Sequence, residues 1–114
     1  MEGEVTVTAR EVGHRTVLAV GGEVDYATVP TVADAVDDAL AAGAVELWLD
    51  FSKIEFMDSA GLHLLIETRR RVAELNRRLA IVCPSPTVLR LIEVAGLDGK
   101  LPVYPDRAAA NRAA

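Results

Sequence analysis

Strand-like and helix-like segments alternate along most of this sequence, and the alternation limits the architectures open to it. Two stretches rich in β-branched residues come first, over 4–9 and 16–20, with Gly13 and His14 between them where a turn is expected. Apolar residues at helical spacing then predict helices over 29–42, from 59 onward and from 85 or 86 to 95, with mostly apolar strands over 44–51, 79–83 and 101–104. Such alternation is typical of parallel strands joined by right-handed crossovers. The sequence therefore predicts an α/β fold, with a mixed sheet that begins as an antiparallel hairpin, continues with parallel strands and has helices packed on it.

The length of the chain predicts one domain. With 114 residues, of which 51% are hydrophobic, it can bury a core without disulfides or a structural metal. No linker, internal repeat or low-complexity segment divides residues 1–114, so we expect a single domain. The tail over 105–114 is rich in alanine but poor in large apolar side chains, and we expect it to fray.

Charge and cysteine content argue against several kinds of partner. The 12 basic and 17 acidic side chains give a formal net charge of −5, whereas nucleic-acid binding needs a basic face. Cys83 is the only cysteine, which excludes an internal disulfide and suits a reducing compartment. The N-terminus has no secretory signal pattern, and no apolar run reaches the length of a membrane span. We therefore expect a cytoplasmic protein whose partner is a protein and not a nucleic acid or a membrane.

Three segments follow strands of the predicted sheet, at 22–26, 52–59 and 84–85, and functional loops of α/β sheets gather beyond such strand ends. Around the second segment, residues 56–62 place Asp58, Ser59 and Gly61 at the first turn of a helix. Free backbone N–H groups at a helix start accept anionic oxygens, so a phosphate on Ser59 could be held locally. Gly61, lacking a side chain, would leave the approach to the Ser59 hydroxyl open.

A plainer interpretation of the same residues is that Asp58 or Ser59 only caps the helix. Both residue types are preferred N-caps, and removing a cap costs about 1 kcal/mol. On spacing alone this interpretation is favoured, because almost every helix needs a cap.

Three motifs in order resemble the STAS domain family, and within it the bacterial anti-sigma factor antagonists of the sporulation and stress-response type. Gly22-Glu23-Val24-Asp25 is similar to that family's Gly-Glu-Leu-Asp after the second strand. Leu49-Asp50-Phe51 followed by Phe56-Met57-Asp58-Ser59-Ala60-Gly61-Leu62 is similar to its central motif, and 86–97 is similar to its third helix. The resemblance covers nearly the whole chain.

The resemblance implies a phosphorylation switch. Ser59 would be phosphorylated by a cognate anti-sigma factor serine kinase, the unphosphorylated form would bind that kinase and free a sigma factor, and a phosphatase would reset the protein. Ala60 takes the place of a second serine found in some members, which leaves one hydroxyl in this segment. The partner-binding residues it implies are Glu23, Asp25, Tyr26, Asp58, Ser59, Ala60 and Gly61. The sequence does not decide whether the chain also forms a weak homodimer.

Parts of the sequence are also compatible with two other functions. A STAS subunit could act as an adaptor in a lipid or anion transport complex, which the intact Asp58-Ser59 pair disfavours. Asp50 ends a predicted strand, as the phospho-accepting aspartate of a receiver domain does. A receiver also needs an acidic pair after its first strand and a lysine after its last parallel strand, whereas here the first strand enters a hairpin and Lys100 is poorly placed. We interpret Asp50 as a strand-end or turn residue.

We expect no enzymatic activity, cofactor or metal. The sequence offers no acid and base pair, metal cluster or cofactor loop at a defensible spacing, and Gly21-Gly22 is interpreted as a turn because it lacks the Lys-Ser/Thr of a phosphate-binding loop. Ser59 would be a substrate and not a nucleophile. His14 and His63 are expected at the surface, and Trp48 and Cys83 in the core.

Overall fold

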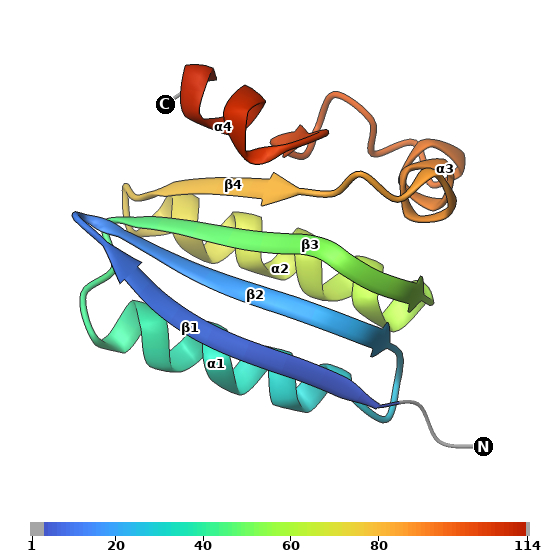
Figure 1. The fold of residues 1–114 in the computed structure, drawn as a ribbon, viewed down its shortest axis with the longest axis horizontal. Helices are drawn as coiled ribbons and strands as arrows, with labels where there is room; N and C mark the ends of the chain where they lie inside the picture. Colours follow the sequence, from blue (N-terminus) through green and yellow to red (C-terminus); the bar gives the residue numbers. More distant parts are fainter. Residues whose placement is uncertain (1–3, 114) are drawn as a thin grey trace.

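The strands of the sheet follow one another in space in the order in which they occur in the chain. The computed structural model describes residues 4–113, and within them five strands form one sheet. These are β1 (Val5–Val12), β2 (Arg15–Val24), β3 (Glu46–Met57), β4 (Arg78–Val82) and β5 (Val103–Tyr104). β1 pairs antiparallel with β2, and the later pairs are parallel (Figure 1). The predicted mixed sheet is confirmed.

The helices pack on both faces of the sheet, but unequally. α1 (Val29–Ala41) and α2 (Ser59–Glu74) lie on one face, and α3 (Pro86–Val94) closes the end of the same core (Figure 1). The buried residues of α1 are Val32, Val36, Ala39 and Leu40, which is the predicted helical spacing. α4 (Arg107–Ala113) contacts β4 and β5 on the opposite face, and no helix of residues 4–113 covers the β1 and β2 end of that face (Figure 1).

Alternate side chains of β3 divide the core in two. Leu47, Leu49 and Phe51 are fully buried on the α1 and α2 face, in the main apolar cluster. Trp48 points to the other face and packs there with Val17, Ala80, Val82 and Ala110. Trp48 and Cys83 are both buried, as predicted, and burial raises the pKa of the Cys83 thiol.

The prediction that the tail would fray is wrong for residues 107–113, which form α4, while Ala114 lies outside the described residues. Ala110 is 2% exposed against the Trp48 cluster. Polar contacts fix both ends of the helix, since Arg107 pairs with Asp50 and Arg78 donates to the carbonyl of Ala113 at 3.1 Å. A small residue suffices for docking here because the sheet supplies the large apolar side chains.

Three strands run beyond their predicted ends, β1 to Val12 and the next two by a longer stretch. β2 continues through Gly21-Gly22, which is therefore not a turn. Gly22 has φ +86°, and a Cβ there would lie 2.3 Å from the carbonyl oxygen of Glu4, so this position suits only glycine. β3 continues to Met57, so residues 52–57 are strand and not loop. Two register shifts between β2 and β3 interrupt the alternation of buried and exposed residues, which hid this extension in the sequence.

Candidate functional site

The site forms where β2 and β3 end side by side. Val24 pairs with Met57 in the last register position of these strands, and the N–H of Asp58 donates to the carbonyl of Val24 at 3.2 Å. The carboxyl ends of both strands lie at the same end of the sheet, next to the start of α2 (Figure 1). The topology thus brings the segment over 23–28 against the segment over 58–61, which overlap the first two of the three segments predicted at this edge, 22–26 and 52–59.

Asp58 joins the two segments and also caps α2. Its Oδ1 accepts hydrogen bonds from the backbone N–H of Ala60 at 2.9 Å and of Gly61 at 3.2 Å, which is N-cap geometry. Its Oδ2 accepts from the backbone N–H of Tyr26 at 3.1 Å. The plainer capping interpretation is therefore correct for Asp58, and the same carboxylate clamps the loop after β2.

The loop after β2 is held by its own short side chains. Oδ1 of Asp25 accepts from the N–H groups of Ala27 at 2.9 Å and Thr28 at 3.0 Å. The hydroxyl of Thr28, a buried residue, donates to the carbonyl of Glu23 at 2.7 Å. Thr28 is not among the residues predicted for the site, although an Asp-x-x-Thr spacing before a helix is a turn signal. Asp25 therefore has a structural role, because its carboxylate holds the backbone of this loop in place.

Ser59 is exposed as the first residue of α2, and its hydroxyl carries no hydrogen bond within the described part of the chain. Tyr26 beside it is 86% exposed, and Phe56, which the sequence analysis did not place in the site, is 45% exposed. Glu23, paired with Phe56 across the strands, is half-buried, as are Asp25, Asp58 and Ala60. All the predicted residues except Gly61 are thus exposed or half-buried near this end of the sheet, where Tyr26 and Phe56 are exposed aromatic residues.

Gly61 has a different role from the one expected. It is buried, and a Cβ at this position would lie 2.5 Å from Cγ of Met57 and 3.1 Å from the carbonyl oxygen of Val24. The missing side chain therefore lets the start of α2 pack against the ends of β2 and β3. The expectation that Gly61 keeps the approach to Ser59 open is wrong.

The local anchoring of a phosphate on Ser59 stays a prediction, and the start of α2 offers few free donors for it. The N–H groups of Ala60 and Gly61 are already occupied by the Asp58 carboxylate, and the N–H of Leu62 donates to the carbonyl of Asp58 at 3.2 Å. A phosphate on Ser59 would therefore have to compete with the Asp58 carboxylate for these N–H groups. His63, one turn further along α2 and exposed as predicted, is the nearest titratable side chain along that helix.

Asp50 lies in the middle of β3 and not at a strand end, which corrects its interpretation. It is 5% exposed, and its Oδ1 accepts from the N–H of Ser52 at 2.9 Å while its Oδ2 accepts from Arg107 Nε at 2.7 Å. Burial works to raise the pKa of Asp50, but the hydrogen bonds from Ser52 and the pairing with Arg107 outweigh it, so the pKa of Asp50 is lowered. Both oxygens have partners, unlike those of an open phospho-acceptor.

Neither a metal centre nor a spanning helix is found in the part of the chain that the structure describes. Within residues 4–113, no three His, Cys, Asp or Glu side chains are grouped so that they could hold a metal ion. Each helix among the same residues is too short or too polar to cross a membrane.

Comparison with known proteins places this geometry in a family. Residues 6–110 match the model of the STAS domain. The anti-sigma-F factor antagonist RsfB of Mycobacterium tuberculosis is 30% identical over 94 residues, which cover 82% of this chain and 76% of RsfB. The anti-sigma-B factor antagonist of Staphylococcus aureus is 31% identical over 80 residues, 70% of this chain and 74% of that protein. The crystal structure of an anti-sigma factor antagonist from Mycobacterium paratuberculosis is 29% identical and superposes with a TM-score of 0.89, covering 96% of this chain and 93% of that one.

Proposed function

The chain belongs to the STAS domain family, and on that premise we propose that it is an anti-sigma factor antagonist switched by phosphorylation of Ser59. Relatives that cover most of the chain carry the name of anti-sigma factor antagonists, which makes an anti-sigma factor the expected partner. In this proposal the unphosphorylated protein binds an anti-sigma factor that is also a serine kinase, and a sigma factor is thereby released. A phosphatase reverses the modification.

The observation that carries the proposal is the exposed Ser59 hydroxyl at the centre of an otherwise well-anchored surface. Asp58 fixes the start of α2 to the loop after β2, so the hydroxyl is presented on a rigid element. Tyr26 and Phe56 expose aromatic side chains at the same end of the sheet. Aromatic side chains in such positions are frequent anchors of protein interfaces.

Phosphorylation would act by charge and not by refolding. A phosphoserine adds a charge of about −1.5 to −2 at neutral pH. The backbone N–H groups of Ala60 and Gly61 already donate to the Asp58 carboxylate. In this proposal the added phosphate leaves that helix cap in place. The result is a second negative charge beside Asp58 on the docking surface. Loss of a few kcal/mol at the centre of an interface lowers affinity by orders of magnitude.

The experiment is incubation of the protein with candidate anti-sigma factor kinases and ATP, followed by mass spectrometry of the peptides. We expect one phosphate, on Ser59, and none in the Ser59→Ala variant, which should still bind the kinase. Ser85→Ala is the matched control, because Ser85 is also a serine at a helix N-terminus, where it caps α3. Phosphate on another residue of Ser59→Ala would overturn the assignment of Ser59.

A further inference from the structure

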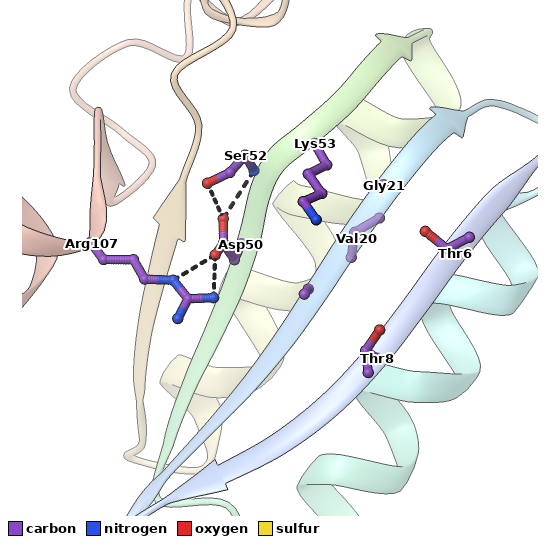
Figure 2. Close-up of a pocket in the computed structure, with 9 residues that line it drawn as sticks. Thr6, Thr8, Val20, Gly21, Asp50, Ser52, Lys53 and Arg107 are labelled. Atoms are coloured by element: carbon purple, nitrogen blue, oxygen red, sulfur yellow. Dashed lines mark hydrogen bonds and ion pairs between the residues drawn. The ribbon is translucent and has the colours of Figure 1, made fainter.

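A shallow polar hollow lies on the face of the sheet opposite α1 and α2, away from Ser59. It encloses about 250 Å³ between β1, β2, β3 and the start of α4 (Figure 2). Its residues form two rows across the strands, since the register pairs Thr6 with Gly21 and Gly21 with Lys53, and Thr8 with Ala19 and Ala19 with Asp50. The middle strand, β2, contributes only Gly21 and Ala19 to these rows. The hollow exists because these two small residues lie between longer polar side chains of β1 and β3.

Gly21 keeps the floor of the hollow open. A Cβ at this position would lie 3.0 Å from Oγ1 of Thr6 and 3.4 Å from Cβ of Lys53. Unlike Gly22, Gly21 does not have a positive φ. The backbone of Gly21 would therefore accept alanine, and the missing side chain matters for space and not for conformation.

A register shift directs Lys53 into the hollow. β3 has one residue more than β2 between the pairs Ala19 with Asp50 and Gly21 with Lys53, which marks a β-bulge. Phe51 and Ile54 are buried in the main core, whereas Ser52 and Lys53 are exposed between them. Figure 2 shows Lys53 on the β2 side of β3, above Val20, with Thr6 and Thr8 across from it.

The groups left unpaired in the hollow are mainly donors. Both oxygens of Asp50 are taken, by Ser52 and by Arg107, whose Nη2 lies 2.6 Å from Oδ2. Within residues 4–113, the Lys53 ammonium, the Arg107 Nη1 and the hydroxyls of Thr6 and Thr8 make no hydrogen bond. Lys53 and Arg107 against Asp50 leave one positive charge in excess, in a chain whose formal net charge is −5.

We propose that this hollow is a binding site for a small oxyanion ligand, held through a phosphate or carboxylate group by Lys53, the free edge of Arg107 and the hydroxyls of Thr6 and Thr8. An ammonium group, the edge of a guanidinium group and neighbouring hydroxyls can all donate hydrogen bonds to phosphate or carboxylate oxygens. The Asp50 carboxylate neutralises half of the basic charge, so the site favours a ligand of low charge over a polyanion. The volume admits a compound of a few carbon atoms. The proposal does not depend on the function of Ser59.

Titration of the isotope-labelled protein with inorganic phosphate, and separately with malonate, tests the proposal by amide NMR shifts at constant ionic strength set with sodium chloride. We expect saturable shifts at Gly21, Ser52 and Lys53 with at least one of the two anions, and the tighter anion identifies the recognised group. Lys53→Gln should weaken binding about tenfold or more, which corresponds to about 1.4 kcal/mol. Gly21→Ala should weaken it as well by filling the floor.

Lys100→Gln is the matched control, because Lys53 and Lys100 are the only lysines of the chain and Lys100 is exposed after α3. It should bind as the wild type does. Shifts that rise linearly without saturation for both anions, or equal affinities in Lys53→Gln and Lys100→Gln, would overturn the proposal. Both variants replace exposed side chains, so their folding is not at risk, and an unchanged amide spectrum elsewhere verifies it.

Discussion

At the residue scale, Asp58 combines a structural role with a place in the proposed partner surface. Its two oxygens accept three backbone hydrogen bonds, two from α2 and one from Tyr26. The cap satisfies N–H groups that the helix itself cannot satisfy. The third bond sets the position of Tyr26 relative to Ser59. The proposed partner surface therefore depends on the same carboxylate that caps the helix.

Asp58→Ala should lower the free energy of unfolding by about 1–2 kcal/mol, the usual cost of an N-cap. It should also weaken binding to the anti-sigma factor, because Tyr26 loses its link to α2. Urea denaturation and a binding titration measure the two effects. Asp58→Asn separates the two effects, since asparagine keeps one acceptor oxygen for the cap but places an NH2 donor where Oδ2 accepts from Tyr26. It should therefore keep most of the stability and still weaken binding, and equal stability losses in Asp58→Asn and Asp58→Ala would contradict the role of the cap.

Gly61→Ala separates packing from access to the hydroxyl. Alanine normally stabilises a helix by about 1 kcal/mol relative to glycine. Here its Cβ would meet Met57 and the backbone of Val24, so we expect a net loss of about 1–3 kcal/mol in the free energy of unfolding. Urea denaturation measures that loss, and the rate of Ser59 phosphorylation should stay near that of the wild type below the unfolding transition. A slow phosphorylation with unchanged stability would instead restore the access role.

Residue types alone predicted the cap, because it follows from the start of one helix, whereas the role expected of Ser59 came from the family resemblance. The contact between Asp58 and Tyr26 joins residues 32 positions apart, and it depends on how far β2 and β3 extend. The roles of Gly61 and Thr28 also arise from packing across elements. Such contacts are invisible in the local pattern of the sequence.

At the element scale, β3 and α4 are the segments where local patterns failed. The bulge in β3 places Ser52 and Lys53 together at the surface. Two consecutive exposed polar residues made the sequence pattern predict that the strand ends at Phe51. α4 has no stripe of large apolar residues, and a seven-residue helix is marginal by itself. Its stability comes from the Trp48 cluster and from the ion pair between Arg107 and Asp50. Tertiary contacts therefore determine where β3 ends and whether α4 forms.

The ion pair between Asp50 and Arg107 predicts a pH-dependent stabilisation of α4. The pKa of Asp50 is lowered in the folded protein from its ordinary value of 3.8, so this stabilisation is present above that value and is lost as the pH falls through the lowered one. Arg107→Gln removes the ion pair of the buried Asp50 carboxylate. It should lower the free energy of unfolding by about 1–3 kcal/mol near neutral pH, with a smaller difference at about pH 3.

Urea denaturation of the wild type and Arg107→Gln across this pH range measures the effect, and the fluorescence of Trp48 follows the docking of α4. Arg112→Gln is the matched control, because Arg112 is an exposed arginine of the same helix. It should match the wild type at every pH. An equal loss in both variants would show that overall charge, and not the pair with Asp50, holds the helix.

At the scale of the whole molecule, the proposed phosphorylation surface and the proposed anion site lie on different parts of one sheet. Ser59 is at the carboxyl ends of β2 and β3, whereas Lys53 and Arg107 face the side that α4 partly covers (Figures 1 and 2). The first surface gathers Glu23, Asp25 and Asp58, and the second carries an excess of basic charge. The net charge of −5 is therefore unevenly distributed, and the acidic part is the one that phosphorylation would make more acidic.

If phosphorylation prevents binding through charge, its effect must depend on salt. The screening length falls from about 10 Å at 0.1 M salt to about 3 Å at 1 M, which weakens repulsion between exposed charges. The ratio of affinities for the anti-sigma factor between wild type and Ser59→Asp should therefore shrink severalfold over that range. Ser59→Asn is the uncharged control of the same size, and it should bind more tightly than Ser59→Asp at low salt and equally well at high salt. A ratio that does not change with salt would mean that the added group blocks docking by its bulk, because steric overlap is not screened.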